Sequence, residues 1–92
     1  MASILCERVA KGLRPSAVIV VFRDYRGKKH YFSCERDFLD KIGDNFYLPV
    51  GVVHVDPKTK AVLVELEHEA ETGVNRVWIP NENMDKPVEE YA

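Results

Sequence analysis

The sequence has few of the residues on which metal sites and phosphate-binding loops depend. Its two cysteines and three histidines are scattered singly, so it lacks the close ligand pairs of a structural zinc site. Its five glycines are isolated, which excludes the glycine-rich loops that cradle phosphates. We therefore predict neither a cofactor nor a metal. The remaining alternative, a mononuclear site of His54, His68 and a glutamate such as Glu67 or Glu69, requires two hairpin ends to meet.

Long apolar runs are missing as well. The longest, AVIVVF at 17–22, is much shorter than the ~20 residues that a membrane span requires. The N-terminal stretch reaches Glu7 after only a few apolar residues, so it lacks the apolar run of a secretory signal. We therefore expect a cytoplasmic protein without a membrane partner, in which Cys6 and Cys34 are free thiols.

Charge is distributed unevenly along the chain. The net charge of −2 combines a basic first half with an acidic second half. The one basic cluster, in the stretch RDYRGKK, comprises Arg23, Arg26, Lys28 and Lys29. Asp24 interrupts this cluster, whereas a nucleic-acid site needs several cations on one face. We interpret the cluster as a solvated hairpin tip and keep weak nucleic-acid binding as the alternative function.

Most of the chain has the residue pattern of β-strands. Residues 17–34 combine β-branched and aromatic residues around the turn signal YRGK, which predicts a hairpin. The stretch NFYLPVGVVHV predicts a long, curved strand, because Pro49 and Gly51 interrupt its ladder. The sequence DPKTK at 56–60 predicts a turn into a further strand, AVLVELE.

Two segments have the spacing of a helix instead. Phe38, Leu39 and Ile42 fall on one side of a helix, which predicts a helix of about two turns that begins at Ser33 or Cys34 and ends at Gly43. Residues 1–15 predict a helical turn or a loose arm, followed by a single β-rich domain. The C-terminal stretch NENMDKPVEEYA has no helical or strand-like periodicity of its apolar residues, which predicts a loose tail.

These elements predict a mainly β protein with one short helix. The strand lengths suggest a small curved antiparallel sheet or a partly open SH3-like barrel of about five strands. A ubiquitin-like roll, in which a hairpin precedes a helix, is the alternative. The predicted division is an arm at 1–15, a β-rich domain at 16–81 and a tail at 82–92. Architecture of this kind does not determine function.

The only tryptophan lies in the stretch HEAETGVNRVWIP, at the end of an acidic loop. Strand alternation places Val77 and Ile79 on one face and Arg76 and Trp78 on the other, so we expect a partly exposed indole. Tryptophan and arginine are the residue types most enriched at binding hot spots. The competing interpretation is that Trp78 plugs an open end of a small barrel.

We therefore predict a non-enzymatic interaction module that holds a protein or a peptide, with a second copy of the chain as one such partner. The residues expected to contact the partner are Glu69, Glu71, Asn75, Arg76 and Trp78. In this hypothesis the loop at 68–75 provides selectivity.

An enzyme is not expected. A cysteine at a helix N-terminus suits a lowered pKa, and Cys34 has this position in the predicted helix. On a strand, however, His30 lies about 13 Å from Cys34 along the backbone, too far for a catalytic pair. The carboxylates of ELEHEAE lack the deep cleft that a glycosidase requires.

Overall fold

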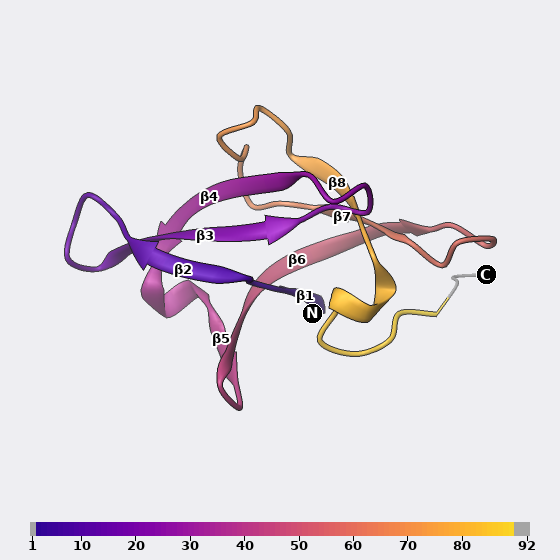
Figure 1. Cartoon of the computed structure of the whole chain (residues 1–92), viewed down its shortest axis with the longest axis horizontal. Coiled ribbons are helices and arrows are strands. Elements are labelled where there is room, and N and C mark those ends of the chain that lie inside the picture. Colours follow the sequence, from indigo (N-terminus) through magenta and orange to yellow (C-terminus); the bar gives the residue numbers. More distant parts are fainter. Residues whose placement is uncertain (1, 90–92) are drawn as a thin grey trace.

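Two antiparallel β-sheets make up the fold (Figure 1). The computed structural model describes residues 2–89. The first sheet contains β1 (Ala2–Leu5), β6 (Asn45–Val55), β7 (Val62–Glu65) and β8 (Arg76–Ile79) in that order, with β5 (Asp40–Ile42) paired to β6. The second sheet contains β2 (Arg8–Lys11), β3 (Ala17–Arg23) and β4 (Lys29–Glu35). The mainly β prediction is confirmed, and over residues 2–89 the strands form no closed barrel.

The core lies between the two sheets. β3 is the central strand of its sheet, in agreement with its continuous apolar run, and its inward residues Val18, Val20 and Phe22 are at most 1% exposed. The first sheet contributes Leu48 and Ile79, each 1% exposed, to the same cluster. Burial of one such side chain contributes about 1.5–3 kcal/mol, so this cluster is the main stabilising term.

Both predicted hairpins are present. β3 pairs with β4 along their whole lengths, from Ala17 opposite Glu35 to Arg23 opposite Lys29. The turn at 56–60 joins β6 to β7, and the Asp56 carboxylate accepts the backbone N–H of Lys58 at 2.8 Å. Local turn chemistry therefore determined both connections.

β6 is the long, bent strand that the sequence predicts. Its first part pairs with β5 and β1, and its second part pairs with β7. Pro49 lies between the residues that pair with β5 and those that pair with β7, where a missing N–H costs little. The register shifts between Val52 and His54, slightly after the expected irregularity at Gly51.

The predicted N-terminal helical turn is wrong, because residues 2–11 form β1 and β2. The N–H of Cys6 donates to Phe46 of β6 at 2.9 Å, and the N–H of Glu7 donates to Val21 of β3 at 2.7 Å. The chain thus passes from one sheet to the other between adjacent residues. Tertiary pairing with two available strand edges overrides the helical spacing of the apolar residues.

The predicted helix between residues 34 and 43 is also wrong. β4 continues to Glu35, a single 3-10 turn (η1, Arg36–Phe38) follows, and β5 then pairs with β6. A helix of two turns is marginal in isolation, and this segment gains strand pairing instead. The ubiquitin-like alternative depended on that helix, and the two sheets establish neither that likeness nor the SH3-like one. No helix among residues 2–89 has the length and apolarity to span a membrane.

The C-terminal segment is ordered where the structure describes it, so the predicted loose tail is wrong for residues 82–89. After a 3-10 turn (η2, Asn81–Asn83), Met84 is 5% exposed and forms a β-bridge with Ile4. The N–H of Asp85 donates to Ser3, whose own N–H donates to the Asp85 carboxylate. The segment therefore covers the open edge of β1. Residues 90–92 of the predicted tail lie outside the described residues.

Replacing Met84 with alanine tests this covering role. We expect a loss of about 2–4 kcal/mol in the free energy of unfolding, because the variant removes a buried side chain and leaves a cavity. Glu82→Ala, which changes an exposed neighbour, should stay within about 0.5 kcal/mol of wild type. Urea denaturation measures both values. Equal unfolding midpoints for the two variants would show that the segment contributes no packing energy.

Candidate functional site

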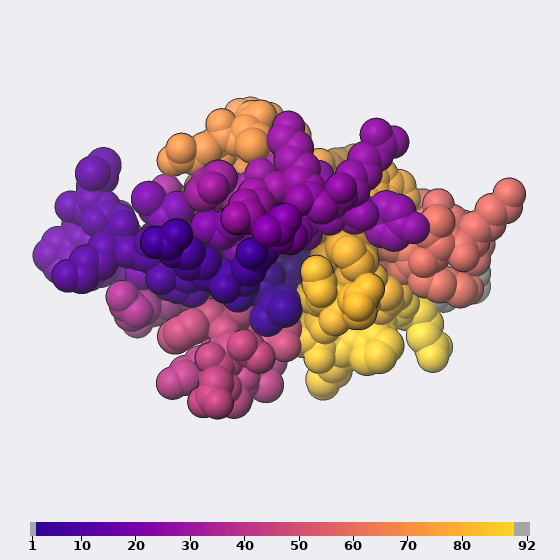
Figure 2. Space-filling model, viewed as in Figure 1, coloured from indigo at the N-terminus to yellow at the C-terminus, as the bar shows by residue number. Residues whose placement is uncertain are grey.

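A hollow of about 810 Å³ lies between the β3–β4 turn, the 56–60 turn and β8. Figure 2 shows the first two of these segments close together at one end of the molecule. The hollow, here called the Trp78 hollow, is lined by residues of both sequence-predicted sites: Arg26 and Lys28 from the basic stretch, and Arg76 and Trp78 from the last strand. The fold therefore joins two surfaces that are far apart in the sequence.

The β3–β4 turn is fixed against β8 by a main-chain hydrogen bond. The N–H of Tyr25 donates to the carbonyl of Trp78 at 2.7 Å. Within the turn, Gly27 adopts a φ of 86°, and the Asp24 carboxylate accepts the N–H groups of Arg26 and Lys28, each at 2.9 Å. The hairpin tip is thus a positioned element of the hollow rather than a free loop.

Trp78 is exposed on β8, as strand alternation predicts. The side chains of Val77 and Ile79 are buried, whereas the tryptophan is 38% exposed, which is inconsistent with the barrel-plug interpretation. The indole meets the ring of His54 edge-on, with ring centroids 6.2 Å apart. Tyr25, which is 48% exposed, provides a second aromatic ring in the same hollow.

The cationic side chains that line the hollow differ in whether an acidic side chain pairs with them. Arg76 pairs with Glu65 at 3.0 Å. Among residues 2–89, no acidic side chain lies within ion-pair distance of Arg26 or Lys28. The Asp56 carboxylate also lines the hollow; its Oδ1 accepts the N–H groups of Lys58 and Thr59, which lower the pKa of Asp56 and keep it ionised. Arg26 and Lys28 are therefore the cations available to a ligand.

The rest of the predicted basic cluster points elsewhere. Arg23 pairs with Glu7 at 2.7 Å and donates to the carbonyl of Gly27 at 3.1 Å. Lys29 lies opposite Arg23 in the β3–β4 ladder, on the outer face of that sheet. The four predicted cations therefore do not form a single surface.

His30 connects the hairpin to the acidic loop, which the sequence did not reveal. The side chain is 2% exposed, with Nε2 at 2.9 Å from Asp24 and Nδ1 at 2.7 Å from the hydroxyl of Thr72. An ionised carboxylate only accepts hydrogen bonds, so Nε2 donates to Asp24. We call this set the His30 clasp. The ring stacks on Phe22, and the side chains of His30 and Asp24 form part of the wall of the Trp78 hollow.

The ionisation of Asp24 depends on this clasp. Burial by itself raises the pKa of Asp24, but the hydrogen bonds from His30, Lys28 and Arg26 outweigh burial and lower the pKa below its ordinary value of 3.8. Asp24 therefore stays charged at neutral pH while it holds the turn.

The loop at 68–75 covers the open edge of β4. The N–H of Glu71 donates to the carbonyl of Tyr31 at 2.8 Å, and Nε2 of His68 lies 2.9 Å from the carbonyl of Ser33. Two carbonyls of the edge strand are thus satisfied by the loop, which protects the edge from further pairing.

The residues predicted to contact a partner are accordingly divided. Arg76 and Trp78 line the Trp78 hollow, whereas Glu69, Glu71 and Asn75 do not. The loop at 68–75 contributes Val74 to the hollow, whereas the acidic side chains from which selectivity was expected do not line it. Tyr25, which the sequence analysis did not single out although it lies in RDYRGKK, replaces the loop as a neighbour of Trp78.

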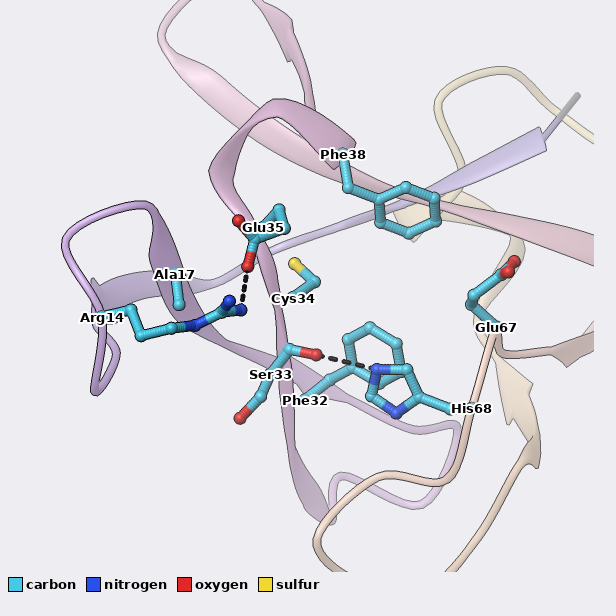
Figure 3. Close-up of a pocket in the computed structure, with 9 residues that line it drawn as sticks. All are labelled: Arg14, Ala17, Phe32, Ser33, Cys34, Glu35, Phe38, Glu67 and His68. Atoms are coloured by element: carbon cyan, nitrogen blue, oxygen red, sulfur yellow. Dashed lines mark hydrogen bonds and ion pairs between the residues drawn. The ribbon is translucent and has the colours of Figure 1, made fainter.

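A second, smaller hollow of about 390 Å³ lies beside β4 (Figure 3). Phe32 and Phe38 line it; His68 stacks on Phe32 at one end and an Arg14–Glu35 ion pair lies at the other. Its walls are largely apolar, and its aromatic rings are already packed or half-buried.

Neither cysteine is an activated nucleophile. Cys34 lines the smaller hollow, and burial together with the nearby Glu35 carboxylate raises the pKa of its thiol. Burial, with a contribution from Cys34, raises the pKa of Cys6 to about 12. Both thiols are free. A thiolate mechanism at neutral pH therefore lacks a suitable group here.

The histidines considered for a metal site lie apart. His54 contacts Trp78, whereas His68 packs on Phe32. Across the part of the chain that the structure describes, no group of three histidine, cysteine, aspartate or glutamate side chains is placed to hold a metal ion.

Acid unfolding tests the His30 clasp. Because the folded-state pKa of Asp24 is lowered, its stabilising contribution is present above pH 3.8 and is lost as the pH falls through the lower folded-state value. Asp24→Asn should be less stable than wild type at pH 7, and the difference should shrink as the pH falls below about 4. Asp37→Asn, on the exposed η1 turn, controls for the loss of a negative charge. A stability difference that is constant with pH would contradict this account of Asp24.

Thiol labelling tests the environment of Cys34. We expect iodoacetamide to alkylate Cys34 with a pH midpoint above that of the urea-unfolded chain, because the folded-state pKa is raised. Mass spectrometry of peptide fragments separates Cys34 from Cys6, which should label more slowly still at each pH. A midpoint for Cys34 below the unfolded value would instead indicate an activated thiol and reopen an enzymatic hypothesis.

The comparisons with known proteins supply no further identification. No family model, curated protein or solved structure matches this chain. The chemistry of the Trp78 hollow must therefore be inferred from the side chains that line it.

Proposed function

We propose that this chain is a non-enzymatic interaction module that binds a peptide segment of a partner protein in the Trp78 hollow. One observation carries the proposal: exposed Trp78 and exposed Tyr25 lie in a single hollow, joined by the main-chain hydrogen bond between them. Aromatic side chains of this kind provide large contact area with a polar group and little conformational entropy to lose.

Preorganisation supports this proposal. Asp24 fixes the turn that carries Tyr25, and the His30 clasp holds Asp24 against the body of the domain. A ligand therefore meets aromatic groups whose backbone is already in place, which reduces the entropy that binding must offset. The volume of about 810 Å³ lies within the range of small-molecule binding pockets.

Charge favours an acidic segment. Arg26 and Lys28 are the unpaired cations of the hollow, whereas its carboxylates, Asp24 and Asp56, accept hydrogen bonds from their own turns. A peptide carboxylate near the turn gains attraction from both cations.

The alternative function, weak nucleic-acid binding, has one supporting feature. Cations beside exposed aromatic rings are the usual elements of single-strand binding sites. Against it, Arg23 is already paired with Glu7, and Lys29 lies on a different face. Two of the four predicted cations therefore do not line the hollow. We therefore favour the peptide.

Two other expectations remain proposals beside this one. A second copy of the chain is the alternative protein partner, and its binding would appear as dimerisation. The likeness of the curved sheets to a partly open SH3-like barrel concerns architecture alone, because one fold supports many functions.

Replacing Trp78 with alanine tests the proposed function. The variant should fold, with a stability loss of about 1 kcal/mol, because the indole is exposed. Its affinity for a partner isolated from native extract by the wild-type chain should fall by about 30-fold or more, the loss expected of a hot spot. Isothermal titration calorimetry measures the affinity.

Tyr31→Ala is the matched control. This tyrosine is 43% exposed on β4 and does not line the hollow, so its removal should leave affinity within about twofold, since non-hot-spot residues are near-neutral. Equal affinities for Trp78→Ala and the wild type would contradict the proposal. Binding that is unaffected by Trp78→Ala, falls steeply with added salt and prefers oligonucleotides would favour the alternative.

A further inference from the structure

We infer that the peptide binds as an added β-strand along the open edge of β8, an inference that rests on the proposed function. The occupant is an extended, acidic segment of a partner protein. Strand addition is a common way in which small domains bind peptides, and it requires main-chain donors and acceptors at an accessible sheet edge.

The hydrogen bonds of β8 determine which of its main-chain groups face outward. In an antiparallel pair, successive residues turn their N–H and C=O groups alternately toward and away from the partner strand. The N–H of Leu66 donates to Asn75 next to the β7–β8 ladder, and the outward carbonyl of Trp78 accepts from Tyr25. The main-chain groups of Val77 therefore face β7, and those of Arg76 and Trp78 face away from it.

The outward groups of β8 are mostly unpaired. Among residues 2–89, the Trp78 carbonyl has Tyr25 as its partner, but no main-chain or side-chain partner occurs for the Trp78 N–H or for either main-chain group of Arg76. Both residues line the Trp78 hollow, so these groups border the hollow itself.

The edges of β1 and β4 are covered, whereas those of β8, β2 and β5 have no strand or covering segment among residues 2–89, and of these three strands β8 is the one that lines the Trp78 hollow. Met84 and Asp85 pair with the outer edge of β1. Two outer carbonyls of β4 are occupied, one by the N–H of Glu71 and the other by the ring of His68. The edge of β8 is closed at a single carbonyl only, directly beside the aromatic rings. An edge left open at a hollow is expected where a partner strand pairs.

The hydrogen bonds of β8 limit the length of the added strand and determine where its side chains lie. A peptide residue opposite Arg76 exchanges two hydrogen bonds with it, and the bond from Tyr25 to Trp78 ends the ladder, so the paired stretch is about three residues long. Peptide side chains on the exposed face of the extended sheet lie beside the indole of Trp78. An acidic side chain of the peptide that points away from β8 meets Arg26 or Lys28 on the β3–β4 turn.

The test uses a synthetic library of short capped peptides in which aromatic or β-branched residues alternate with either acidic or basic ones. Fluorescence of Trp78, the only tryptophan, reports binding directly. We expect acidic members to bind and basic members to bind at least about tenfold more weakly, since both available cations attract carboxylates. A single-stranded oligonucleotide serves as the probe for the alternative class of ligand.

Methylating one peptide nitrogen at a time tests strand addition itself. N-methylation removes a donor and blocks pairing, so affinity should fall at least about tenfold at nitrogens that face β8 and change little at the alternate ones. On the protein, hydrogen exchange of the Trp78 and Arg76 amides should slow when the peptide binds. Loss of affinity on N-methylation that does not alternate along the peptide would overturn the inference. Unchanged hydrogen exchange of both the Trp78 and the Arg76 amides would also overturn it.

Arg76→Pro and Arg76→Ala form a matched pair of variants. Proline removes the outward N–H without removing a bond to β7, whereas alanine removes the side chain and keeps that N–H. We expect Arg76→Pro to bind at least about tenfold more weakly than Arg76→Ala, with circular dichroism confirming that both fold. The exchange measurement on the wild type decides the inference if proline prevents folding.

The two proposals fail in distinguishable ways. If no peptide changes the Trp78 fluorescence, or only the oligonucleotide does, both the proposed function and strand addition are overturned. If peptides bind and calorimetry shows that Trp78→Ala abolishes binding, but N-methylation has no alternating effect, the proposed function stands and strand addition is wrong.

Discussion

The hydrogen bond from the Tyr25 N–H to the Trp78 carbonyl is the contact on which the proposed site depends. It joins the turn of one sheet to the edge strand of the other, and it places two exposed aromatic rings and two unpaired cations around one hollow. The His30 clasp supports this contact, because Asp24 holds the turn and is itself held by His30. Without these bonds, the hairpin tip would be a mobile, solvated loop.

Edge protection explains much of the remaining architecture. The C-terminal segment covers β1, and the acidic loop covers β4, so two segments predicted to be loose or to bind a partner serve the stability of the sheets instead. The partly open edge of β8 differs from the open edges of β2 and β5 because it borders the Trp78 hollow. Exposed main-chain donors and acceptors next to aromatic rings offer a peptide both affinity and direction.

The sequence predicted the fold best where the determining interactions are local. The hairpin at 17–34, the 56–60 turn and the outward position of Trp78 follow from turn chemistry and strand alternation. The prediction failed at residues 2–11 and 34–43, where apolar residues at helical spacing form strands and a 3-10 turn. Both segments lie beside strands that offer hydrogen-bond partners, which local spacing does not reveal.

By itself, the sequence determined that the protein is mainly β and that its only tryptophan shares a strand face with Arg76, because alternation is a property of neighbouring residues. Only the tertiary structure decided that Tyr25, Arg26 and Lys28 line one hollow with Trp78 and that Glu69 and Glu71 of the acidic loop do not. These contacts join residues far apart in the chain. Their formation depends on how two sheets pack around one core, which no local pattern specifies.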